Sequence, residues 1–146
     1  MPFVEQALVI DARDDDWLCD AMALWAGHLA GGAWDGVEDL HGELRLCWEG
    51  TYLYFYLRFV DDELSAPETH PKRLWENDGM QFAFDALANG RSPYDDLRYG
   101  MSESPDGVKV QSYSPQSEGV PLNVAVAVRY VGYKRMYEWA LPWGDL

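Results

Sequence analysis

The chain has 146 residues, enough to bury the core of one domain, and 48% of them are hydrophobic, which excludes general disorder. With 11 basic and 25 acidic residues, the formal net charge is −14. Such a chain cannot build a surface that neutralises the phosphates of nucleic acid or an anionic membrane, so we expect neither partner and favour a neutral ligand.

The N-terminus and the cysteines set few constraints. The opening MPFVEQALVI lacks the basic start and long apolar run of a signal peptide. No apolar run approaches the roughly 20 residues that span a bilayer, so we expect a soluble domain. Cys19 and Cys47 can form one disulfide in an oxidising compartment or remain two buried thiols. We favour free thiols, because only the even number of cysteines supports a bond.

In chain order, the first expected elements are a strand over 7–11 and a helix over 14–30. Asp14 to Asp16 are suited to cap that helix, since carboxylates accept the free N–H groups of a helix N-terminus. Its apolar side consists of Trp17, Leu18, Ala21, Leu24 and Trp25. This is the only helix that the sequence predicts.

From residue 44 onward, apolar residues alternate with others, which indicates strands. In 53–60, one face carries Leu53, Phe55, Leu57 and Phe59, and the other carries Tyr54, Tyr56 and Arg58. This pattern is typical of a half-buried antiparallel strand with a polar-aromatic reverse side. Further strands are expected at 44–49, 79–85, 97–103, 108–114, 122–129 and 137–141.

Turn signals such as Glu49-Gly50, Asn89-Gly90 and Asp106-Gly107 separate these strands. About eight short strands with little helix predict an all-β fold, a two-sheet antiparallel β-sandwich of jelly-roll or immunoglobulin-like type. The expected buried residues are Phe55, Leu57, Phe82, Phe84, Val124, Val126 and Trp139, and alternation also places Trp48 inside.

The faces that alternation leaves outside the core combine small residues with isolated polar ones. The small residues are Ala83, Gly100, Ala125, Ala127 and Ala140, and the polar ones are Gln81, Arg98, Arg129 and Glu138. A floor of small residues with a few hydrogen-bonding groups suits a shallow ligand cleft. A second layer over such a face, for instance the 14–30 segment, explains the pattern equally well.

Three segments, taken in order, resemble the family 9 carbohydrate-binding modules and their wider relatives. They are WDGVEDLHGELRLCWEGTYLYFYLRFVDD (34–62), WENDGMQFAFD (75–85) and YEWALPW (137–143). Between them, Tyr94-Asp95-Asp96 is similar to the family's acidic pair before the next strand. Each motif alone is weakly specific, but their order and spacing extend over most of the chain.

The resemblance implies one sandwich domain over 1–146 that binds neutral sugars, often at chain ends, without catalysis. It also implies a tethered glycoside hydrolase or other polysaccharide-active enzyme, a secreted, cell-surface or periplasmic location, and often a structural calcium. Asp61, Asp62 and Asp78 are the candidate oxygen ligands for that calcium, with turn capping as the alternative.

Trp75 occupies the family's stacking position, where the apolar C–H face of a sugar lies on an indole ring. Gln81, on the following strand, and Arg98 are then expected to bind sugar hydroxyls. Family members continue past the P-W segment into strands and a loop that can supply a second clamping aromatic, whereas this chain ends at Leu146. Within the chain, Trp34 or Tyr94 can complete the clamp, unless the clamp is absent.

Three alternatives compete with sugar binding. A glycoside hydrolase needs two carboxylates at a set separation, and candidates for such a pair are Glu76, Asp78, Asp95 and Asp96. In a chain with 25 acidic residues, however, acidic pairs are expected by chance. Dopamine-monooxygenase-like relatives bind haem b through Met and His, for which this chain offers Met80, Met101, His28, His41 and His70. Methionines on a core face are usually packing residues, however. The third alternative is an interaction sandwich that has lost its cleft.

Overall fold

The computed structural model describes residues 1–24, 36, 40–61, 65–85, 88, 90, 96–114, 117–122 and 124–145. These residues contain eight strands in two antiparallel sheets and two short 3-10 helices, so the predicted all-β fold with two sheets is confirmed. The chain divides into two compact units, the first formed by 1–63 with 124–145 and the second by 64–123. None of the helices in the described residues is long and apolar enough to cross a membrane.

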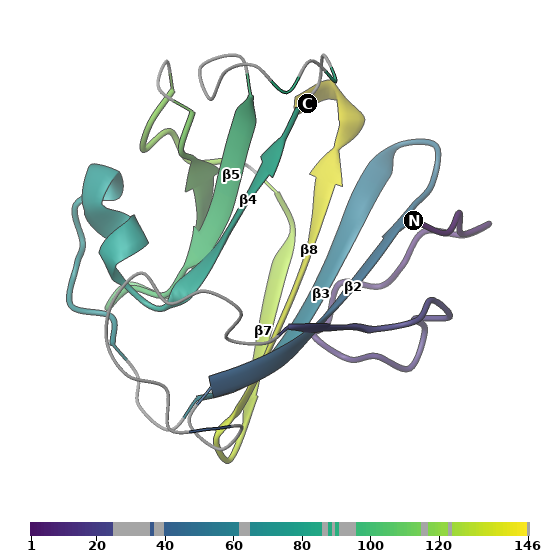
Figure 1. Ribbon diagram of the computed structural model, residues 1–146, viewed down its shortest axis with the longest axis horizontal. Coiled ribbons are helices and arrows are strands. Elements are labelled where there is room, and N and C mark those ends of the chain that lie inside the picture. Colours follow the sequence, from purple (N-terminus) through teal and green to yellow (C-terminus); the bar gives the residue numbers. More distant parts are fainter. Residues whose placement is uncertain are drawn as a thin grey trace. The chain divides into compact units, whose positions relative to one another are not determined.

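The first unit contains a five-stranded sheet in the order β1-β2-β3-β8-β7 (Figure 1). Its strands are β1 (Met22–Leu24), β2 (Leu40–Trp48), β3 (Tyr52–Asp61), β7 (Val126–Val131) and β8 (Lys134–Pro142). All neighbouring strands are antiparallel. Gly132, with φ +61°, occupies the tight turn between β7 and β8, a left-handed conformation that glycine adopts readily.

Both faces of β3 are buried, which corrects the prediction of a half-buried strand. One face holds Leu53, Phe55, Leu57 and Phe59, and Phe55 stacks on Trp139 of β8 with ring centroids 4.7 Å apart. On the other face, Tyr54 and Tyr56 are only 1% and 4% exposed. Tyr54 and Tyr56 belong to a buried cluster that includes Ala12, Trp17, Cys19, Cys47, Met136 and Ala140.

Residues 8–19 therefore form an N-terminal cover over this face of the sheet, visible as the purple segment beside β2 and β3 (Figure 1). Trp17 lies against Tyr56, with ring centroids 5.7 Å apart, and donates its indole N–H to Glu138 at 2.8 Å. Glu138 is fully buried and also accepts the backbone N–H groups of Asp11 and Ala12 at 2.8 and 2.7 Å. In this unit, the second-layer explanation of the small-residue face is correct.

The predicted helix over 14–30 is wrong in its described part, residues 14–24. Residues 14–21 form turns and bends, and Met22–Leu24 pairs with β2 as strand β1. Trp17 and Cys19 are buried while Leu18 is 92% exposed, the alternation of an extended backbone. The tertiary contacts of Trp17 outweigh the local helix pattern, and residues 25–30 lie outside the described residues.

The strand predicted over 7–11 is also wrong. The N–H of Val9 bonds to the carboxylate of Asp16, and that of Asp11 bonds to Glu138, so these backbone groups are used by side chains. Such side-chain partners replace the ladder that a strand requires. The chain joins this sheet earlier, through an isolated bridge between Phe3 and Trp48.

Two residues predicted to be internal lie at the surface. Trp48 and Val126 are each 36% exposed, the first at the end of β2 and the second at the start of the edge strand β7, where few neighbours can cover them. Trp48 contacts the rings of Phe3 and Trp143, at 4.9 and 6.3 Å between centroids. Trp143 also donates its indole N–H to the carbonyl of Glu49, at 2.9 Å. The other predicted core residues are buried or half-buried.

Cys19 and Cys47 are free thiols in the buried cluster under the N-terminal cover, as we favoured. Burial, the neighbouring thiol of Cys19 and nearby carboxylates raise the pKa of Cys47 to about 12. Cys47 is therefore protonated at neutral pH and is a packing residue rather than a nucleophile.

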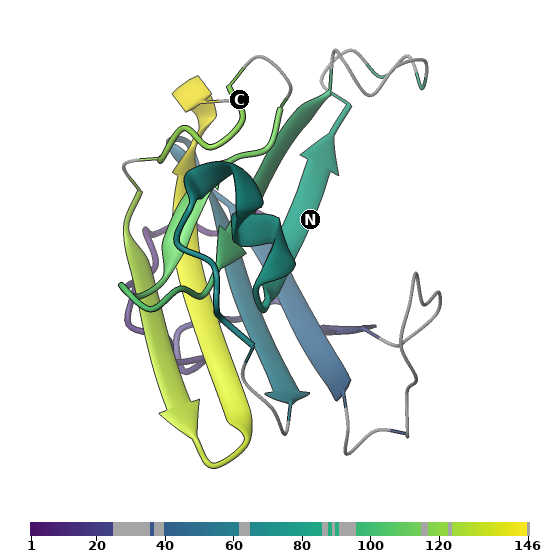
Figure 2. The same cartoon turned by 90° about the vertical axis from the view of Figure 1, so that its left-hand side faces the viewer.

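The second unit contains a three-stranded sheet in the order β4-β5-β6. Its elements are the 3-10 helix η1 (Pro71–Glu76) and the strands β4 (Gly79–Phe84), β5 (Leu97–Ser102) and β6 (Lys109–Ser112). Figure 2 shows η1 as a short coil that leads directly into β4. Met80, Phe82 and Phe84 alternate with Gln81 and Ala83 along β4, as predicted, and the apolar side chains are the less exposed set.

Candidate functional site

Three of the five predicted site residues lie in the second unit. Trp75 is in η1, Gln81 is in β4 and Arg98 is in β5. Trp34 and Tyr94 lie outside the described residues. The structure therefore brings the predicted stacking residue and both predicted hydroxyl partners into one compact unit, and it leaves the second half of the aromatic clamp undescribed.

Gln81 and Arg98 occupy the same face of the sheet. Gln81 lies opposite Gly100, and Ala83 lies opposite Arg98, and residues directly opposite in an antiparallel pair share a face. Gln81 and Ala83 are exposed. We call this surface the polar face of the second sheet.

The guanidinium group of Arg98 has no hydrogen bond or ion pair within the part of the chain that the structure describes, where its backbone alone is bonded. In contrast, Arg45, Arg58, Arg73 and Arg135 each pair with a carboxylate. Arg98 is half-buried beside the small side chain of Ala83 and keeps a full set of donors for an external acceptor.

Two residues that complete this face, Gln111 in β6 and Tyr113 directly after it, were not predicted as site residues. Gln111 lies opposite Gly100 and is 2% exposed, and the ring of Tyr113 lies over Gly100. A Cβ at position 100 would approach Cε2 of Tyr113 to 2.6 Å, so only glycine leaves room for this ring. The hydroxyls of Tyr113 and Ser102 share a hydrogen bond of 2.9 Å. Alternation over 108–114 could have placed Gln111 and Tyr113 on this face.

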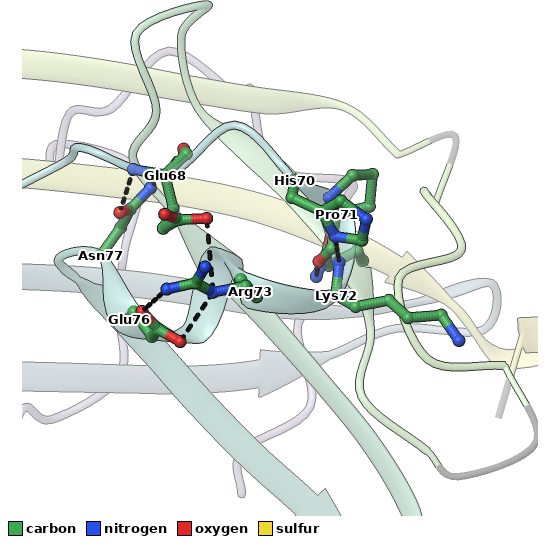
Figure 3. A network of polar contacts seen from close by, with 8 residues as sticks. Glu68, His70, Pro71, Lys72, Arg73, Glu76 and Asn77 are labelled. Carbon is green, nitrogen blue, oxygen red and sulfur yellow. Dashed lines mark hydrogen bonds and ion pairs between the residues drawn. The ribbon is translucent and has the colours of Figure 1, made fainter.

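Trp75 is 53% exposed, and its side chain makes no hydrogen bond or ring contact with the described residues. The backbone on either side of it is held firmly (Figure 3). Arg73 forms two hydrogen bonds with Glu76, at 3.0 and 2.8 Å. Asn77 donates to the carbonyls of Glu68 and Glu103, at 2.8 and 2.7 Å. A large apolar ring is thus displayed to solvent on an ordered turn.

The carboxylates near Trp75 are engaged as structural partners. The hydrogen bond from Arg73 lowers the pKa of Glu76, whereas a general acid needs a raised pKa. Asp78 accepts the N–H of Ser65 at 2.8 Å, the turn-capping role considered above. Asp95 lies outside the described residues. Glu76 therefore lacks the environment of a glycosidase acid.

The described residues do not bring the candidate metal and haem ligands together. Asp61 pairs with Arg135 at 3.2 Å, and Asp62 lies outside the described residues. Over those residues, no group of three His, Cys, Asp or Glu side chains is placed to hold a metal ion, so calcium stays a prediction. Met80 and Met101 face each other across β4 and β5, and Nδ1 of His70 accepts the N–H of Lys72.

The first unit contains a small hollow of about 80 Å³, lined by residues that include His41, Glu43, Arg58 and Lys134. Arg58 forms an ion pair with Glu43 there, so these two charges are already satisfied. None of the predicted sugar-binding residues lines this hollow. The second unit, which contains the exposed ring of Trp75 and a guanidinium of Arg98 that is unpaired among the described residues, is the stronger candidate.

Comparison with known proteins identifies similar folds and a family. The fold is similar to a family 9 carbohydrate-binding module from Caldicellulosiruptor kristjanssonii in complex with cellotriose, with a TM-score of 0.65 and 13% identity over 97% of this chain. A module of that family and organism in complex with glucose gives a TM-score of 0.58 and 13% identity over 96% of this chain. This chain spans 66% and 67% of those two chains. No curated protein matches it.

These likenesses, at 13% identity, show a shared β-sandwich fold. The family is shown by the sequence itself, because residues 10–146 match the model described as carbohydrate family 9 binding domain-like. The match includes Trp75, Gln81 and Arg98, which the structure brings together in the second unit. The chain therefore belongs to the family 9 carbohydrate-binding domains.

Proposed function

We propose that the polar face of the second sheet binds neutral carbohydrate without catalysing a reaction. The observation that carries the proposal is Trp75, a 53% exposed indole on an anchored turn, with no partner among the described residues. An exposed apolar ring of this size has an unfavourable contact with water, and the C–H face of a sugar can cover it. Trp75 is therefore the stacking platform.

Gln81 and Arg98 supply the directional contacts to hydroxyl groups. The exposed amide of Gln81 can both donate and accept, and the unpaired guanidinium of Arg98 can donate from a rigid fork. Ala83, opposite Arg98 and two residues from Gln81 on β4, adds little bulk between these two side chains. The net charge of −14 disfavours an anionic sugar and favours a neutral one.

The related modules were solved with cellotriose and with glucose, so β-glucan fragments are the first ligands to test. We propose that residues 1–146 act as one accessory module of a secreted or surface-bound polysaccharide-active enzyme. The family description as a binding domain supports the binding part of this role. A second ring would clamp the sugar from the opposite side, and Trp34 and Tyr94 are the candidates within the chain.

The decisive experiment compares Trp75→Ala with Trp143→Ala. Trp143 is 37% exposed and lies in the first unit, so it is a matched surface tryptophan outside the proposed site. Calorimetric titration with cellotriose should show a loss of roughly tenfold to a hundredfold for Trp75→Ala, because stacking and buried C–H area are removed. Trp143→Ala should retain the affinity.

Unchanged affinity in Trp75→Ala would contradict the proposal, as would an equal loss in both variants. The affinity of the unmodified protein should change little between about 50 and 500 mM salt, since a neutral sugar releases no counterions. A reducing-sugar assay on each retained polysaccharide should detect no cleavage. Cleavage would show that the module is itself an enzyme.

A further inference from the structure

The ring of Trp75 makes no hydrogen bond or ring contact with the described residues, so its position depends strongly on its backbone. The turn that carries it, η1, is only six residues long, and Leu74 is its one buried residue. A helix this short has little stability of its own. Contacts at the two ends of η1 must therefore fix where the ring stands.

The end of η1 that leads into β4 is held by Asn77, which bonds to backbone groups of Glu68 and Glu103. The beginning is held differently, by a side chain from the polar face itself. Gln111 of β6 donates its amide N–H to the carbonyl of Pro71 at 2.7 Å. Gly119, at φ +80°, also approaches this end, and a Cβ there would lie 3.2 Å from Pro71 and Lys72.

Gln111 is part of a buried polar network. Its side chain is 2% exposed and also hydrogen-bonds to Tyr113, whose hydroxyl shares a hydrogen bond with Ser102. Tyr113 in turn lies over Gly100, which is opposite Gln81. One network thus joins the start of η1 to the strands that carry Gln81 and Arg98.

We propose that Gln111 is a positioning residue of the glycan site, which fixes the turn carrying Trp75 relative to Gln81 and Arg98. This inference rests on the proposed function of that face. A side chain without an N–H or O–H cannot donate to the carbonyl of Pro71, so Gln111→Met keeps the length of the side chain and removes the hydrogen bond. The carbonyl of Pro71, on an exposed residue, can then bond to water, and the turn is released.

The first test observes Trp75 without any sugar. Protein labelled with 5-fluorotryptophan contains seven fluorinated indoles, and the resonance absent from Trp75→Phe belongs to Trp75. In Gln111→Met, this resonance should move toward its position in urea-unfolded protein while the other six stay in place. Gln6→Met, the same substitution at an exposed position in the first unit, should move none of them. An unmoved Trp75 resonance in Gln111→Met overturns the inference.

The second test is a double-mutant cycle on cellotriose affinity. Gln111→Met should weaken binding roughly three- to tenfold in the unmodified protein, the worth of one hydrogen bond. In the Trp75→Ala background, where NMR titration can follow weak binding, it should cost less than about twofold, because Gln111 acts through Trp75. Equal losses in both backgrounds overturn the positioning role. If the unmodified protein binds no glycan, the proposed function fails, and the fluorine test alone decides whether Gln111 holds the turn.

Discussion

Two sheet faces of this protein share a pattern of small residues around a polar one, but they differ in how far the polar side chain is buried. In the first unit, Ala127, Ala140 and Glu138 lie on a face that the N-terminal cover seals, so Glu138 is fully buried. In the second unit, Ala83 and Gln81 lie on the exposed part of the polar face, whereas Gly100 on the same face is covered by the ring of Tyr113. Small residues around a polar group therefore indicate a close approach from above. The N-terminal cover approaches at Glu138, the ring of Tyr113 approaches at Gly100, and a proposed ligand approaches at Ala83.

The polar groups distinguish the two cases. Glu138 receives three N–H donors from the N-terminal cover, which is how a buried carboxylate is tolerated. Gln81 and the guanidinium of Arg98 have no such partner among the described residues. A face whose polar groups are satisfied by the chain is structural, and a face whose groups are left open is the better place to seek a ligand.

The largest expected difference is between the two tryptophans of these faces. Trp17 is 4% exposed and Trp75 is 53% exposed. Trp17→Ala should lower the free energy of unfolding by about 3–5 kcal/mol, because it opens a cavity and removes the indole donor from Glu138. Trp75→Ala should change it by less than about 0.5 kcal/mol. Urea unfolding measures both, and a large loss of stability in Trp75→Ala would make that ring structural.

Glu138→Gln should lower the free energy of unfolding by about 2–3 kcal/mol, because the amide presents an NH₂ group to one of the N–H donors. The effect should depend on pH. Burial raises the pKa of Glu138, with the N–H bonds from Trp17, Asp11 and Ala12 opposing the shift. Relative to Glu138→Gln, the stability from Glu138 is then fully present below the pKa of a glutamate in the unfolded chain and is lost as pH rises through the raised pKa of the folded state. A stability difference that grows with rising pH would contradict this direction.

Gly100→Ala tests the close approach on the polar face. The new Cβ would meet Cε2 of Tyr113 at 2.6 Å and the carbonyl of Met80 at 2.7 Å. We expect a loss of about 1–3 kcal/mol in the free energy of unfolding, since the contact with backbone cannot relax easily. Gly50→Ala, which has nothing within 4 Å of its Cβ, is the matched control and should be nearly neutral. Thermal unfolding measures the stability of both variants. Equal stabilities would contradict the close contacts with Tyr113 and Met80.

The smallest expected effect is that of Arg98→Met. The substitution keeps the apolar stem and removes the donors, so cellotriose affinity should fall roughly three- to tenfold. The free energy of unfolding should change by less than about 0.5 kcal/mol, because the guanidinium is unpaired among the described residues. Arg129→Met, on the exposed part of β7, should affect neither quantity. A loss of stability without a loss of affinity would assign Arg98 to the structure.

The sequence alone determined the strands and the residues that define the family. The strong alternation predicted β3, β4 and β8 within a few residues, because the period of a strand is a local property of the chain. The same local motifs selected Trp75, Gln81 and Arg98, which all lie in the second unit. Their role in binding stays a prediction.

Only the tertiary structure decided which face of each sheet is covered. Alternation assigns side chains to two faces but does not say which distant segment lies over them. The bond between Asp11 and Glu138 joins residues 127 apart in the chain, and that contact turned an expected helix and strand into an extended cover. Likewise, the positioning role proposed for Gln111 rests on the hydrogen bond from its amide to the carbonyl of Pro71, 40 residues earlier, which the sequence does not predict. Burial is set by such long-range contacts, which no local pattern contains.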